Sequence, residues 1–113
     1  MTNAEVASLL KKRRLELNLK LEDVGNALGV HKSTISRWES GDVNSIKSGH
    51  LYLLAKVLYL PVETLLGFDT DKKIESAETI LLRKKIESEV EKIHDKDVLE
   101  QVLRIVKTFI NKE

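Results

Sequence analysis

The segment from Leu21 to Gly41 reads LEDVGNALGVHKSTISRWESG, and it decides the fold expected for this chain. Apolar residues recur at helical spacing on both sides of Gly29, which predicts two short helices over residues 21–28 and 32–39. Glycine suits the left-handed backbone that follows a helix, so Gly29 is expected to end the first of them. Two short helices joined by such a tight turn form a helix-turn-helix.

The rest of the chain also predicts helices. Thr2 stands three residues before Glu5, a capping-box spacing that predicts a helix over about 2–17. Ser48 is expected to cap a helix over about 49–59, and Pro61 suits the first position of another that ends at Gly67. Two longer helices are expected over about 74–93 and 98–110, the second of them capped by Asp97.

The expected fold class is therefore all-α, with three parts. A five-helix helix-turn-helix domain over residues 1–67 is followed by a short linker over 68–73 and a C-terminal helical hairpin over 74–113. The break at His94 to Asp97 is short, so the last two helices are expected to run antiparallel.

Composition bounds the function. The chain has 113 residues, of which 42% are hydrophobic, enough for one core. It has no cysteine, and its three histidines are isolated, so neither a metal site nor a cofactor is expected. No apolar run approaches the roughly 20 residues that span a bilayer, and the N-terminus lacks the order of a signal peptide. A cytoplasmic location is expected, while the net charge of +1 is no argument for nucleic acid.

Several separated features resemble the phage-repressor and Cro type of helix-turn-helix, the Xre-like family. They are Arg14 at the end of the first helix, the turn Gly29-Val30, STISRWESG over Ser33–Gly41, LLAK over Leu53–Lys56 and VETLLG over Val62–Gly67. The resemblance covers about residues 6–67. It implies a five-helix domain that binds double-stranded DNA, usually as a dimer on a near-palindromic operator. It also implies a partly buried ion pair between Arg14 and Glu39.

The sequence departs from the family pattern at three places. Lys20 and Leu21 stand where the family usually has a Ser or Thr cap and a Gln that reaches a phosphate. Gly25 replaces a small Ala, which permits close helix packing but weakens the helix by about 1 kcal/mol. His31 replaces the usual Ser or Thr cap of the recognition helix.

The candidate DNA contacts surround the second helix of the motif. The N-terminal end of a recognition helix lies deepest in the major groove, and Arg and Lys match the acceptors of guanine. The candidates for contacts to base edges are Lys32, Ser33, Ser36 and Arg37. The candidates for phosphate contacts are Lys20, His31, Thr34, Ser40, Asn44 and Lys47. The alternatives are solvated surface charges at Lys32 and Arg37, a helix cap at His31 and turn chemistry at Asn44. Trp38 is expected in the core.

The last helix carries a wider apolar arc than one neighbouring helix needs. The candidates for a dimer interface are Val98, Leu99, Val102, Leu103, Val106, Phe109 and Ile110. In the alternative, this hairpin folds back on the N-terminal domain and hides the arc.

Two functions fit these expectations. The first is a dimeric transcription repressor of phage or bacterial operon type. The second is an antitoxin that holds a toxin through residues 68–113 and represses its own operon. An enzyme is not expected, because the segment after Gly67 is too short for a self-cleaving peptidase domain. Inactivation by an antirepressor or a protease is therefore implied.

Overall fold

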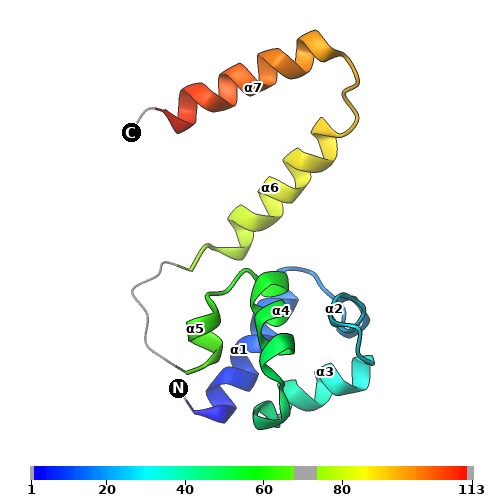
Figure 1. The fold of residues 1–113 in the computed structure, drawn as a ribbon, viewed down its shortest axis with the longest axis vertical. Helices are drawn as coiled ribbons and strands as arrows, with labels where there is room; N and C mark the ends of the chain where they lie inside the picture. Colours follow the sequence, from blue (N-terminus) through cyan, green and yellow to red (C-terminus); the bar gives the residue numbers. More distant parts are fainter. Residues whose placement is uncertain (1, 68–73, 112–113) are drawn as a thin grey trace. The chain divides into compact units, whose positions relative to one another are not determined.

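The computed structural model describes residues 2–67 and 74–111, and the predicted linker over 68–73 lies outside them. Within these ranges the chain forms only helices and turns (Figure 1). They are α1 (Asn3–Glu16), α2 (Leu21–Leu28), α3 (Lys32–Glu39), the short 3₁₀ helix η1 (Val43–Ser45), α4 (Ser48–Leu58), α5 (Val62–Leu65), α6 (Ala77–Val90) and α7 (Lys96–Ile110). The all-α prediction is confirmed.

The turn between α2 and α3 depends on two glycines. Gly29 has φ 74°, the left-handed conformation that was expected to end α2. Gly25 lies against the turn, and a Cβ added there would come within 2.7 Å of the Val30 carbonyl oxygen. The Val30 N–H in turn donates to the Gly25 carbonyl at 2.9 Å. The missing side chain at Gly25 therefore allows α2 to approach the first residues after the turn closely.

The helix caps agree with the sequence at some ends and differ at others. Thr2 caps α1, since its hydroxyl accepts from the Glu5 N–H at 3.2 Å. α4 begins at Ser48 itself, which is its first helical residue and not its cap. α7 begins two residues earlier than expected, because Asp95 accepts from the N–H groups of Asp97 and Val98. Asp95, and not Asp97, is therefore the cap of α7.

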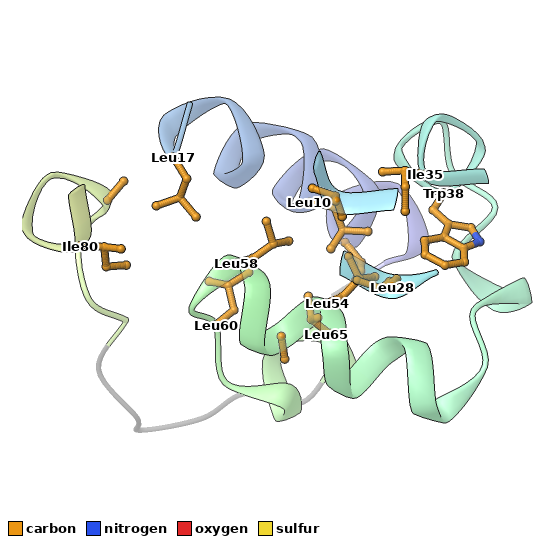
Figure 2. Packing of buried hydrophobic residues seen from close by; sticks show 14 residues of the cluster. Leu10, Leu17, Leu28, Ile35, Trp38, Leu54, Leu58, Leu60, Leu65 and Ile80 are labelled. Carbon is orange, nitrogen blue, oxygen red and sulfur yellow. The ribbon is translucent and has the colours of Figure 1, made fainter. Parts of the chain in front are cut away.

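One hydrophobic core joins α1 to α5 and includes the start of α6. Its buried members are Val6, Leu10, Leu17, Val24, Leu28, Ile35, Trp38, Leu54, Ala55, Leu58, Leu60, Leu65, Ala77 and Ile80. Figure 2 shows these side chains gathered between the helices, with Trp38 at one end of the cluster and Ile80 at the other. The helix-turn-helix is therefore held in place by packing on both of its neighbours in sequence.

The N-terminal compact unit extends beyond Gly67. The chain divides into two units at Ile80, a point inside α6. Ala77 and Ile80 are 7% and 1% exposed and belong to the core described above. The first turn of α6 is thus part of the folded N-terminal unit.

Arg13 holds this extension in place. Its guanidinium is buried and donates to three backbone carbonyls: Nε to Leu58 at 2.7 Å, and Nη2 to Tyr59 at 3.2 Å and to Glu75 at 2.7 Å. The first two carbonyls lie at the C-terminal end of α4, where helix carbonyls lack helical partners. The third lies just before α6, so one side chain links α1, the end of α4 and the start of α6.

The second unit contains the rest of α6 and all of α7. No residue of α7 is buried. The two predicted C-terminal helices are present, and their antiparallel arrangement as a hairpin stays a prediction. The two buried apolar residues of α6, Ala77 and Ile80, belong to the N-terminal core. None of the helices described is long and apolar enough to span a bilayer.

Candidate nucleic-acid interface

α3 has a buried face and an exposed face. Ile35 and Trp38 are each 2% exposed and anchor the helix to the core. The four side chains predicted to contact base edges are all exposed: Lys32, Ser33, Ser36 and Arg37. Residues at spacings of one, four and five positions share one side of a helix, so the structure brings these four together on the outer surface of α3. A short rigid helix thus presents two cations and two hydroxyls to solvent.

Two of these four side chains already have partners. The Ser33 hydroxyl lies 2.8 Å from His31 Nδ1, which also accepts from the Ser33 N–H at 3.1 Å. His31 is therefore the N-cap of α3, the alternative role considered for it in the sequence. Arg37 Nε lies 3.0 Å from Asp42 Oδ2. The structure shows no such partner for Lys32 among the residues it describes.

The candidate phosphate contacts lie around this face. Five of the six are exposed, namely Lys20, His31, Ser40, Asn44 and Lys47, while Thr34 is half-buried. The Ser40 hydroxyl donates to the Ser36 carbonyl at 2.9 Å. Lys20 and Lys32 line the same open surface hollow, where the end of α1 meets the starts of α2 and α3. Glu22 lines the same hollow, so the two lysines there are offset in part by one carboxylate.

Arg14 and Glu39 form an ion pair beneath this surface. Arg14 donates through Nε and Nη2 to the two Glu39 carboxylate oxygens, at 2.7 and 3.0 Å, and through Nη1 to the Leu19 carbonyl at 2.9 Å. The two side chains are only 9% and 7% exposed. The pair joins α1 to the last residue of α3, so it fixes the recognition helix against the helix that precedes the motif.

Trp38 belongs to the core and not to an exposed stacking surface. Its ring lies 5.8 Å from the ring of His50, and its Nε1 is buried without a hydrogen-bond partner among the described residues. In the same part of the chain, no cluster of three His, Cys, Asp or Glu residues is placed to hold a metal ion.

Two residues with clear roles were not identified from the sequence. Arg13 stands beside Arg14 in the run KKRR, and nothing in that run distinguishes the two buried arginines from the exposed Lys11 and Lys12 or shows that Arg13 bonds to backbone carbonyls. Asp42 follows Gly41, beyond the end of α3, so helical spacing could not indicate that it reaches back to Arg37.

Comparison with known proteins agrees with this architecture. The family model described as helix-turn-helix matches residues 10–65, which run from the middle of α1 to the end of α5. No curated protein and no solved structure matches the chain. The matched residues include both helices of the motif, the turn at Gly29 and the Arg14–Glu39 pair. Through residues 10–65 the chain therefore belongs to the helix-turn-helix family of the phage-repressor, or Xre-like, type, a family of DNA-binding transcription regulators.

Proposed function

We propose that this protein is a dimeric repressor that reads the major groove of duplex DNA with the exposed face of α3. The observation that carries the proposal is the combination of a buried face, Ile35 and Trp38, with an exposed polar face on one short helix. Such a helix can enter a groove without losing its packing on the domain. The regulated operon is of phage or bacterial type.

The proposed base contacts come from Lys32, Ser33, Ser36 and Arg37. Arg37 can donate two hydrogen bonds to the O6 and N7 acceptors of one guanine, and Lys32 can donate to another. Lys20, Asn44 and Lys47 supply phosphate contacts on either side, which set the register without reading sequence. The number of such cations is small, so we expect a modest dependence of affinity on salt.

The test begins with selection of preferred sites from a pool of randomised duplexes. Arg37→Ala should then weaken binding to the selected site by about 1–3 kcal/mol and relax one base position. Lys12→Ala is the matched control, because Lys12 is an exposed cation of α1 outside the proposed interface. A footprint and a site preference that survive Lys32→Ala and Arg37→Ala together would show that α3 does not read the bases.

The proposed dimer interface is the apolar surface of α7. The exposed large apolar residues of this helix include Val98, Leu103, Ile105, Val106, Phe109 and Ile110. Leu99 and Val102 lie between them, so apolar residues recur at spacings of three and four along the helix. A contiguous exposed apolar stripe of this kind is typical of an interface.

A second copy of the chain is the proposed occupant. One recognition helix contacts too few base pairs for useful specificity, whereas two related by a twofold axis read half-sites about 34 Å apart. Twofold homodimers are also the commonest oligomers of soluble proteins. Pairing of α7 with α7 would therefore bury the stripe and join the two reading domains.

The dimer is tested by sedimentation at micromolar concentration. Leu103→Glu and Val106→Glu place a charge on the stripe, while Gln101→Glu adds the same charge at an exposed polar position of α7. The unaltered chain and Gln101→Glu should sediment as dimers, and the two stripe variants as monomers. Equal sedimentation of all four proteins would exclude this surface as the interface.

The antitoxin function stays as the alternative for the same surface. An unaltered chain that is monomeric, but forms a stable complex with the product of a neighbouring gene, would favour it. Loss of that complex in Leu103→Glu, and not in Gln101→Glu, would place the toxin on α7.

A further inference from the structure

We propose that Asp42 is a specificity-determining residue that orients the Arg37 guanidinium for contact with a guanine. This inference rests on the proposed function, since it assumes that α3 enters the major groove. It starts from the ion pair described above, in which Arg37 Nε lies 3.0 Å from Asp42 Oδ2.

The geometry leaves the contacting end of Arg37 available. A guanidinium carries five N–H donors in a rigid planar fork. Asp42 Oδ2 lies 3.0 Å from Nε, the nitrogen nearest to the aliphatic chain, as an ion pair, and the Arg37 side chain makes no hydrogen bond within the described residues. The two terminal nitrogens are a pair of donors suited to guanine O6 and N7. Asp42 therefore contacts the guanidinium at Nε and leaves the two terminal nitrogens open to a base.

Asp42 is itself held by the backbone that ends α3. Its N–H donates to the carbonyl of Arg37, the residue it pairs with, at 3.3 Å. Its carbonyl accepts from the Ser45 hydroxyl at 2.9 Å. Gly41, with φ 126°, turns the chain so that residue 42 comes back toward the helix. The backbone of Asp42 is thus held on one side by α3, through the Arg37 carbonyl, and on the other by η1, through the Ser45 hydroxyl.

This arrangement reduces the cost of ordering a long side chain. A free arginine on a protein surface samples many rotamers and loses that freedom when it binds. A carboxylate on a fixed turn restricts the rotamers before DNA arrives, and preorganisation of this kind improves binding by lowering the ordering cost. The benefit falls on the one base pair that Arg37 contacts.

The pair contributes little to folding. The Arg37 and Asp42 side chains are 58% and 47% exposed, and ion pairs in such settings have small effects on stability. A carboxylate close to DNA is also repelled by the phosphates. Removal of the Asp42 charge should therefore act in two opposite directions: non-specific affinity rises, and discrimination at one base pair falls.

The experiment measures both quantities for the full chain. Asp42→Asn and Asp42→Glu are compared with the unaltered protein on the selected duplex, on duplexes changed one base pair at a time, and on a duplex of unrelated sequence. For Asp42→Asn we expect discrimination at a single position to fall by about three- to tenfold, part of what a two-bond arginine contact supplies. Asp42→Glu, which keeps a carboxylate, should restore part of it.

Two controls separate orientation from simple charge repulsion. Glu22→Gln removes one exposed negative charge from the first turn of α2 and should raise affinity on all duplexes alike. When Asp42→Asn is added to the Arg37→Ala variant, the double variant should discriminate between base pairs as the single variant Arg37→Ala does, at every position. Uniformly higher affinity of Asp42→Asn, with discrimination unchanged at every position, would overturn the role of Asp42. Absence of any preferred site for the unaltered protein would instead overturn the proposed function.

Discussion

α1 and α7 are helices of nearly equal length that differ in what covers them. α1 has 14 residues and buries Val6, Ala7, Leu10, Arg13 and Arg14, while α7 has 15 residues and buries none. α7 nevertheless carries the more regular apolar stripe in its sequence. The comparison teaches that apolar spacing predicts a helix and its apolar face. The spacing does not show which surface, if any, of the same chain covers that face.

The largest loss of stability is expected when the chain is cut after Gly67, before α6 and α7. A chain ending at Gly67 lacks Ile80, and the loss of this side chain should lower the free energy of unfolding by about 2–5 kcal/mol, as an Ile-to-Ala change does. It also leaves the buried Arg13 without one of its acceptors, which should cost about 1–3 kcal/mol more. A chain ending at His94 keeps both and loses only α7. Urea unfolding should show the shorter chain to be much less stable. Equal midpoints for the two chains would mean that the start of α6 does not belong to the N-terminal unit.

A smaller effect is expected from breaking the buried ion pair. Glu39→Gln leaves the Arg14 guanidinium without its carboxylate, and it should lower the free energy of unfolding by about 3–5 kcal/mol. Glu100→Gln makes the same chemical change on exposed α7 and should change stability by no more than about 0.5 kcal/mol. Thermal unfolding of both variants measures the contrast. Similar melting temperatures for the two would show that water reaches the Arg14–Glu39 pair.

The smallest effect on folding is expected on α7. Leu54 is 1% exposed and Leu103 is 52% exposed. Leu54→Ala should therefore cost about 2–5 kcal/mol, whereas Leu103→Ala should move the unfolding of the N-terminal unit by less than about 0.5 kcal/mol. Leu103→Ala should instead weaken self-association, which sedimentation across a concentration series detects. A large loss of stability at every protein concentration would mean that Leu103 is buried within its own chain.

Much of the site follows from local spacing. The bounds of α2 and α3 agree with the prediction to the residue, because apolar periodicity and Gly29 act within one short segment. The exposed group of Lys32, Ser33, Ser36 and Arg37 follows from the same spacing, since one face of a short helix must pack on the core. Helix starts were less predictable, because competing cap residues such as Asp95 and Asp97 stand close together.

By itself, then, the sequence determined the helices, the turn and the face that α3 shows to solvent, all of which depend on residues a few positions apart. The tertiary structure alone decided three other features. The N-terminal unit extends to Ile80, Arg13 bonds to carbonyls 45 and 62 residues away, and Asp42 reaches back to Arg37 across a turn. The first two join segments whose separation in sequence has no fixed relation to their separation in space, and only the packing of the helices around one core brings them together. The third depends on the backbone turn at Gly41, which helical spacing does not describe.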